Sequence, residues 1–171
     1  ETAANILACR LAELGVPVQM HDVSVTHYSY VLSDCFKYSH IVFAAPTFNN
    51  GIFDPMEHLL RDLAHHNLQN RRVALIQNGS WAPTSGKLMA EILGGMKNME
   101  VVEAPVTLKS ALAPGQEGEL EALARALGEL YPGKKLIFLT GVLADKDWST
   151  MMGELLPLAK EFYTVTPDSP R

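Results

Sequence analysis

The sequence has few of the features that mark membrane, secreted or nucleic-acid-binding proteins. Its two cysteines, Cys9 and Cys35, fit neither a metal-site nor a redox spacing, so we expect reduced thiols in a cytoplasmic protein. No apolar run reaches the roughly 18 residues of a membrane-spanning helix, and residues 1–15 carry no basic leader of the signal-peptide type. With 14 basic against 19 acidic residues, the net charge of −5 argues against a nucleic acid or an anionic membrane as partner.

What the sequence does contain is enough apolar material for a folded domain. Hydrophobic residues make up 47% of the 171 positions, and charged residues make up 19%. This balance is typical of a globular protein and not of a disordered one. The length fits one domain, or one domain with an appendage.

Helical and strand-like patterns alternate along the whole chain. Apolar spacing and start and stop residues predict helices over 1–14, 28–38, 54–65, 84–93, 117–130 and 147–162. For the helix over 54–65, Asp54 is predicted to be the cap and Pro55 the first helical residue. Short apolar or alternating segments predict strands over 16–23, 40–45, 73–77, 100–108 (interrupted by Pro105), 136–140 and 163–166. The alternation predicts a three-layer α/β/α sandwich around a mostly parallel, doubly wound sheet.

Two loops that follow predicted strands carry unusual side chains for turns. They read PTFNNGIF at 46–53 and QNGSWAPTSGK at 77–87. In doubly wound sheets, ligands lie beyond the carboxyl ends of the strands, where both loops are expected. Phe48 and Trp81 are large apolar groups for exposed loops, so a flat ligand could lie against them. The simpler alternative is a turn with Asn at left-handed positions followed by a helix start at Pro55.

These stretches also carry a family resemblance. PTFNNGIFDPMEHLLRDL and IQNGSWAPTSGKLM resemble the flavodoxin-like domain of flavodiiron proteins, also called A-type flavoproteins, and the likeness runs over about residues 1–127. The resemblance implies a five-stranded parallel sheet of order 2-1-3-4-5 that binds FMN. It also implies that two groups of residues line the flavin ring. The group on one side is Thr47, Phe48, Asn49, Asn50 and Gly51, and the group on the other side is Asn78, Gly79, Ser80 and Trp81.

Elementary chemistry agrees with that implication. An aromatic face on a planar ring contributes about 0.5–1.5 kcal/mol beyond area burial, and amides supply the donors and acceptors that the ring edge needs. The resulting prediction is an electron-transfer module without a catalytic acid or base, with a redox protein as its partner, as a monomer or a homodimer. We expect no metal, because the iron-binding domain of that family is not in this sequence. His58, His65 and His66 are interpreted as exposed histidines near a helix end.

The same resemblance leaves one element of the fold unaccounted for. Flavodoxin-like domains start with a central strand and a Ser/Thr-rich phosphate loop, and this sequence begins at Glu1-Thr2-Ala3, where that loop would end. Without the phosphate loop, FMN binding is expected to be weakened. Our hypothesis is that strand 136–140 fills the vacant central position. The alternative places 136–140 and 163–166 at the far edge of the sheet.

The C-terminal part resembles a second family. GVLADKDW (141–148) and TVTPDSPR (164–171) resemble the C-terminal domain of folylpolyglutamate synthases, without the ATP-binding loop, so ligase activity is not expected. The predicted organisation is a flavodoxin-like segment over 1–130 and a β-α-β segment over 131–171 that completes the same domain. The joining of segments that resemble two different families indicates a chimera, which is either natural or an engineered, de novo protein. The alternative function is therefore an α/β chimera that folds without cofactor or activity.

Overall fold

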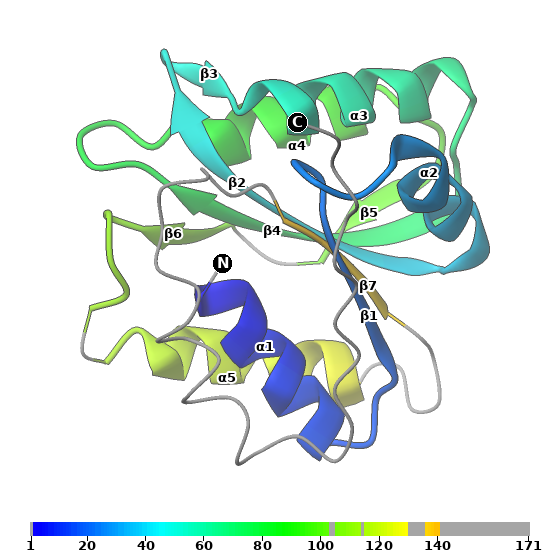
Figure 1. Cartoon of the computed structure of the whole chain (residues 1–171). Coiled ribbons are helices and arrows are strands. Elements are labelled where there is room, and N and C mark those ends of the chain that lie inside the picture. Colours follow the sequence, from blue (N-terminus) through cyan, green and yellow to red (C-terminus); the bar gives the residue numbers. More distant parts are fainter. Residues whose placement is uncertain (1, 103–104, 114, 130–135, 141–171) are drawn as a thin grey trace, which may run out of the picture.

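The structure is a computed structural model that describes residues 2–102, 105–113, 115–129 and 136–140. Its helices are α1 Thr2–Glu13, α2 Tyr28–Lys37, α3 Asp54–His65, α4 Ser85–Gly94 and α5 Glu117–Glu129. Its strands are β1 Val18–Asp22, β2 His40–Phe48, β3 Gly51–Ile52, β4 Arg71–Asn78, β5 Met99–Val101, β6 Val106–Leu108 and β7 Leu136–Thr140. Helices cover both faces of the sheet, so the predicted α/β/α sandwich is confirmed (Figure 1).

The sheet has the strand order β1-β7-β2-β4-β5, and all neighbours along this path are parallel. β7 lies inside the sheet, next to the edge strand β1, and Leu136 is in register with Val18 of β1 on one side and with His40 of β2 on the other. The hypothesis that strand 136–140 fills the vacant position is therefore confirmed, and the edge placement is wrong for this strand. The predicted helix 147–162 and strand 163–166 lie outside the described residues.

Two apolar cores hold the layers together, one on each face of the sheet. On one face, α1 and α5 pack on Val42, Ala44, Ala74 and Ile76. On the other face, α2, α3 and α4 pack on Ile41, Phe43, Val73, Leu75, Ile137 and Leu139. Successive residues of β2 and β4 thus point to opposite cores, which explains why these strands are apolar throughout instead of alternating.

Several element boundaries differ from the prediction, while the predicted interruption at Pro105 is confirmed. β2 does not end at Ala45, because it continues through Phe48 and then turns back as β3. The strand predicted over 100–108 is split into β5 and β6, as expected from a proline, which has no N–H for the ladder. Asp54 does not cap α3: Phe53 occupies the cap position, and Asp54 is the first helical residue.

Two further sequence predictions concern the described residues. Cys9 and Cys35 are both free thiols, as expected. Burial of Cys35 in the core between α2 and the sheet raises its pKa to about 12. None of the helices in the described ranges combines the length and the apolarity that crossing a bilayer requires.

Candidate functional site

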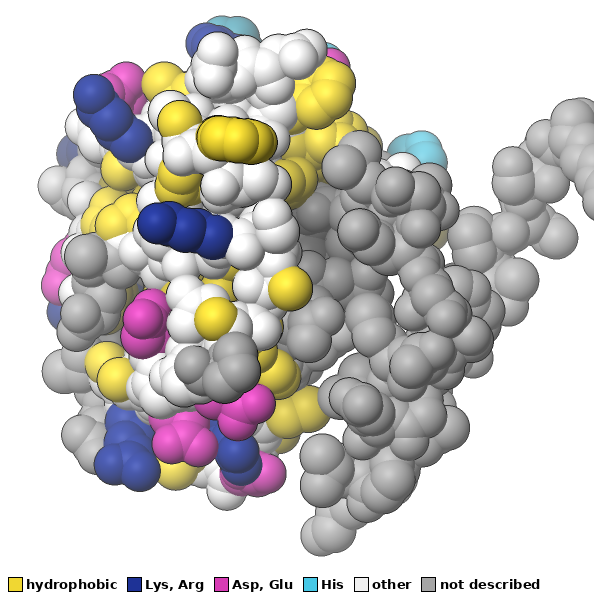
Figure 2. Space-filling view, turned by 90° about the vertical axis from the view of Figure 1, so that its left-hand side faces the viewer, with side chains coloured by type: hydrophobic (Ala, Val, Ile, Leu, Met, Phe, Trp, Pro, Cys, Tyr) yellow, Lys and Arg dark blue, Asp and Glu magenta, His cyan; other side chains and the backbone are white. Residues whose placement is uncertain are grey.

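The two loops singled out in the sequence start side by side. β2 and β4 are adjacent parallel strands, and Pro46 is in register with Asn78 at their carboxyl ends. β6 also pairs with the end of β4, so the segment after Leu108 emerges at the same edge. We call this edge, made of 46–53, 78–84 and 108–112, the rim (Figure 1). Figure 2 views the molecule from this side and shows separate hydrophobic side chains set among polar groups and backbone.

The stretch 46–53 is a tight β-hairpin. Phe48 pairs with Gly51 across a two-residue turn, and Thr47 pairs with Ile52 one step below. Both turn residues are left-handed, with φ of 47° at Asn49 and 59° at Asn50. A two-residue hairpin turn of this type needs positive φ at both positions, and Asn tolerates that conformation better than most residues. The two asparagines are therefore explained by the turn itself, and their side chains remain exposed.

Two aromatic side chains stand in solvent at the rim. Phe48, the last residue of β2, is 44% exposed, and Trp81 in the loop after β4 is 98% exposed. Isolated exposed apolar residues are ordinary, but two aromatics on neighbouring loops at the ligand-binding edge of this fold are a specific arrangement. The rim thus presents two aromatic side chains that the described residues leave accessible to solvent.

Hydroxyl groups join the hairpin to the start of α4. Thr47 Oγ1 accepts hydrogen bonds from the backbone N–H groups of Thr84 at 3.0 Å and Ser85 at 3.1 Å. Ser85 Oγ is buried and donates to the carbonyl of Ala45 at 3.0 Å. Thr84 Oγ1 donates to the carbonyl of Asn50 at 3.0 Å. Both the stem and the turn of the hairpin are therefore tied to α4.

The end of β4 contributes a further tie to the same helix. The N–H of Gly86 donates to Gln77 Oε1 at 2.9 Å, and Gln77 Nε2 donates to Thr107 Oγ1 at 2.8 Å. A Cβ on Gly86 would lie 2.8 Å from Gln77 Oε1 and 3.1 Å from Pro105 Cβ, so the helix approaches β4 where only glycine fits.

Asn78 connects the loop after β4 to the segment after β6. Its side-chain Nδ2 donates to the carbonyl of Ser110 at 2.8 Å, and its Oδ1 accepts from the N–H of Ser110 at 3.1 Å. The hydroxyls of Ser80 and Ser110 are 2.7 Å apart, and the N–H of Gly79 donates to the carbonyl of Leu108 at 3.0 Å. Ser110 has a left-handed φ of 67°, so these bonds hold a conformation that serine rarely adopts.

The structure brings all nine residues predicted to contact the ring to one edge, where the first group is hydrogen-bonded to Thr84 and the second to Leu108 and Ser110. The polar side chains of Thr47 and Asn78 are already engaged with backbone groups. The sequence analysis missed the supporting residues Gln77, Thr84, Ser85 and Ser110. Thr84 and Ser85 were recognised as a helix start, which is a signal for their position but not for their partner. No signal in the sequence points to Ser110.

A second polar cluster lies away from the rim, on α2 and α3. The hydroxyl of Tyr28 donates to Asp62 Oδ2 at 2.7 Å, and His58 and His65 lie beside the same carboxylate, at 3.4 Å and 3.9 Å. Burial and this bond raise the pKa of Tyr28, and the bond from Tyr28 lowers the pKa of Asp62. Within the described ranges, no group of three or more His, Cys, Asp or Glu is placed to hold a metal ion.

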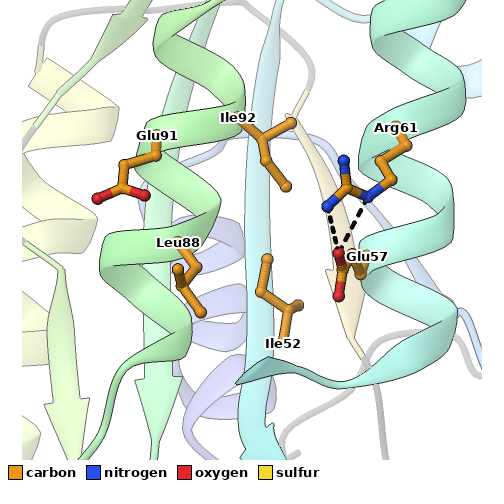
Figure 3. Close-up of a pocket in the computed structure, with 6 residues that line it drawn as sticks. All are labelled: Ile52, Glu57, Arg61, Leu88, Glu91 and Ile92. Carbon is orange, nitrogen blue, oxygen red and sulfur yellow. Dashed lines mark hydrogen bonds and ion pairs between the residues drawn. The ribbon is translucent and has the colours of Figure 1, made fainter. Parts of the chain in front are cut away.

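A shallow groove of about 280 Å³ runs between α3 and α4, beside the hairpin (Figure 3). Ile52, Leu88 and Ile92 give it apolar walls, and Arg61 pairs with Glu57 along the α3 side. The groove shares Ile52 with the hairpin, and its other lining residues belong to α3 and α4. Apart from Ile52, it is therefore built from residues outside the rim.

Comparison with known proteins was made by sequence and by structure, and no family model matches the chain. The chain is 24% identical to the rubredoxin-oxygen oxidoreductase of Megalodesulfovibrio gigas over 134 residues, which is 78% of this chain and 33% of that protein. Among solved structures, the rubredoxin oxygen:oxidoreductase of Desulfovibrio gigas aligns with a TM-score of 0.69 and 24% identity, over 75% of this chain and 32% of that one.

Two other solved structures are similar. A flavodiiron protein from Giardia intestinalis has a TM-score of 0.68 and 17% identity, over 75% of this chain and 32% of its own. An archaeal flavodoxin has a TM-score of 0.63 and 18% identity, over 75% of this chain and 87% of its own. These likenesses show that the fold is flavodoxin-like. The chain spans about a third of the length of the curated relative that it matches.

Proposed function

We propose that this chain contains a flavodoxin-like module that binds FMN and transfers electrons. The observation that carries the proposal is the rim, where two hydrogen-bonded loops present Phe48 and Trp81 at the carboxyl ends of adjacent parallel strands. Likeness to an archaeal flavodoxin over 87% of its chain supports the choice of a flavin over other flat ligands. Likeness to a flavodiiron protein and to rubredoxin-oxygen oxidoreductases supports a redox role.

The residues at the rim fit the ring of a flavin. Exposed aromatic faces suit a broad planar π-system, and backbone groups and amides suit its polar edge. Of the residues expected from the sequence, the proposed contacts are Phe48, Asn49, Asn50, Gly51, Asn78, Gly79, Ser80 and Trp81. When bound, FMN supplies the electron-transfer chemistry, and this chain's residues hold the ring and set its surroundings.

The phosphate of FMN has no suitable place at three of the helices that start near the rim. The first N–H groups of α4 are occupied by oxygens of Thr47 and Gln77. α3 carries Asp54 and Glu57 in its first turn, and α5 carries Glu117 and Glu119. Acidic side chains there oppose a phosphate, whereas free N–H groups would attract one. The residues that follow β7, from position 141 on, lie outside the described residues.

The domain organisation belongs to the same proposal. We infer that residues 131–171 complete the module formed by 1–130, because β7 lies between β1 and β2 inside the sheet. The motifs that resemble folylpolyglutamate synthase lie at 141–148 and 164–171, outside the described residues, and none of the relatives reported above is of that kind. That resemblance, and the chimera it indicates, stay predictions.

We propose a redox protein as the partner, since an electron carrier needs a donor and an acceptor. The name of the curated relative includes the word rubredoxin, so a rubredoxin is the first partner to examine. The relative is about three times as long as the stretch matched here, so its complete reaction is not carried over to this chain.

The test is a titration of the purified chain with FMN, followed by quenching of flavin fluorescence. We expect saturable 1:1 binding, weakened several-fold or more by Trp81→Ala, which removes one aromatic face. Tyr30→Ala is the matched control, because Tyr30 is a 68% exposed aromatic on α2. A colourless protein that quenches no FMN fluorescence at high concentration would contradict the proposal and favour a fold without cofactor.

A further inference from the structure

Helix α4 begins without the cap that its own sequence offers. Thr84 occupies the cap position, where a threonine side chain ordinarily accepts an N–H from the first turn, but it makes no such bond. Its hydroxyl donates instead to the carbonyl of Asn50 at the turn of the hairpin. Distant parts of the chain supply the acceptors: Gln77 Oε1 accepts the N–H of Gly86 in the first turn, and Thr47 Oγ1 accepts the N–H groups of Thr84 and Ser85.

The hydroxyl of Thr47 has no bonding capacity left. It accepts two hydrogen bonds and lies 3.3 Å from Ser85 Oγ, to which it donates. A hydroxyl group has one donor and two acceptor positions, so all three are used within the protein. A ligand could bond to this hydroxyl only by displacing one of these three partners, and displacing an N–H would leave that N–H without its acceptor.

Three side chains, those of Thr47, Thr84 and Ser85, together make what we call the hydroxyl clasp. It holds the hairpin at its stem, through Thr47 and the carbonyl of Ala45, and at its turn, through the carbonyl of Asn50. It therefore fixes the hairpin against the start of α4, which directly follows the loop that carries Trp81. The spacing between the two loops of the rim depends on these bonds.

We propose that Thr47 is a positioning residue: through the hydroxyl clasp it sets the placement of the two rim loops, and its hydroxyl contacts no ligand. The inference rests on the proposed function, because the ligand whose binding it affects is FMN. It differs from the expectation drawn from the sequence, in which Thr47 lines the ring directly. The two roles predict different behaviour of the protein without FMN.

The experiment compares Thr47→Val, which keeps the shape but removes the hydroxyl, with Thr47→Ser, which keeps the hydroxyl. Hydrogen exchange at the amides of Thr84 and Ser85 is measured by NMR in the FMN-free protein, and FMN affinity by fluorescence titration. We expect Thr47→Val to speed exchange at both amides at least tenfold and to weaken FMN binding about tenfold. Thr47→Ser should restore both values, and the absorption bands of the bound flavin should return to their wild-type shape.

Two outcomes would overturn the proposal. If Thr47→Val weakens FMN binding without changing exchange at the two amides, Thr47 acts on the ligand directly. If it speeds exchange but leaves the affinity and the flavin spectrum unchanged, the clasp stabilises α4 without positioning the site. A wild-type protein that binds no FMN overturns the proposed function instead, and the exchange rates then still show separately whether Thr47 joins the two segments.

Thr84→Val provides a second route if Thr47→Val does not fold. It keeps both N–H bonds to Thr47 and removes only the bond to the carbonyl of Asn50. We expect FMN binding to weaken about threefold, since one of the ties is lost, with restoration by Thr84→Ser. Wild-type affinity in Thr84→Val would overturn the part of the proposal that concerns the hairpin turn.

Discussion

The two loops of the rim reach their conformations by different routes. The hairpin 46–53 is held by a short antiparallel ladder and by a turn whose two asparagines accept left-handed φ. The loop 78–84 adopts neither strand nor helix after Asn78. It is held from outside, by the bonds of Asn78, Gly79 and Ser80 to the segment after β6.

This difference separates local from tertiary determinants within one site. A turn that needs positive φ at two positions restricts which residues can occupy them, so four or five neighbouring residues determine the conformation of the hairpin. A loop held by side chains across 30 or more positions, as Asn78 is to Ser110, depends on the sheet bringing those positions together. We therefore expect the loop to be more sensitive than the hairpin to substitution, and the following predictions test this.

The largest expected effect is that of Gly79→Ala, with Gly51→Ala as its counterpart in the hairpin. A Cβ on Gly79 would lie 2.9 Å from Pro83 Cα, so the backbone of the loop must shift. On Gly51 it would meet only the carbonyl of Phe48, at 3.3 Å. Urea unfolding should show a loss of about 2 kcal/mol for Gly79→Ala and less than about 1 kcal/mol for Gly51→Ala. Equal losses would remove the contrast between the two loops.

Removal of the Asn78 side chain should have the next largest effect. Asn78→Ala deletes both hydrogen bonds to Ser110 and releases a serine from an unfavourable left-handed conformation. We expect a loss of about 1–2 kcal/mol in unfolding free energy. Faster hydrogen exchange at the amide of Ser110 should accompany it, while the amides of the hairpin stay as protected as in the wild type. Unchanged exchange at Ser110 would show that other contacts hold this segment.

A smaller and wholly local effect is expected at the hairpin turn. Asn50→Ala places a residue that disfavours positive φ at φ 59° and should lower the unfolding free energy by about 1 kcal/mol. Asn50→Gly should restore or slightly exceed wild-type stability, because glycine adopts this conformation freely. If glycine fails to restore it, the Asn50 side chain itself contributes to the hairpin, and the hairpin is less locally determined than we infer.

The smallest effect should come from a tertiary tie far from the rim, the bond from Tyr28 to Asp62. This bond lowers the pKa of Asp62, so the stability it adds is present above the ordinary Asp pKa of about 3.9. That stability is lost as the pH falls through the lowered value in the folded state. Tyr28→Phe should therefore be slightly less stable than the wild type near pH 6, and the gap should close on acidification. A gap that widens below pH 4 would contradict this assignment.

Much of the fold was predictable because helices and strands leave periodic apolar patterns. The helix starting at Tyr28 and strand 136–140 begin where predicted, and the break at Pro105 follows from its missing N–H. The place of β7 inside the sheet was one of two alternatives, and only the pairing with β1 and β2 decided between them. The extension of β2 to Phe48 was not predicted, because a proline, here at position 46, cannot donate to the strand ladder and so indicates the end of a strand.

The sequence by itself determined the layered α/β architecture, the emergence of the two loops at one edge of the sheet, and the hairpin turn at Asn49 and Asn50. These depend on periodicity, chain order and the φ preferences of neighbouring residues. The tertiary structure alone decided that Thr47 bonds to the start of α4, that Asn78 binds Ser110, and that β7 completes the sheet. The physical reason is that a hydrogen bond between distant segments depends on where the whole sheet places their backbones, and residue types alone do not specify that.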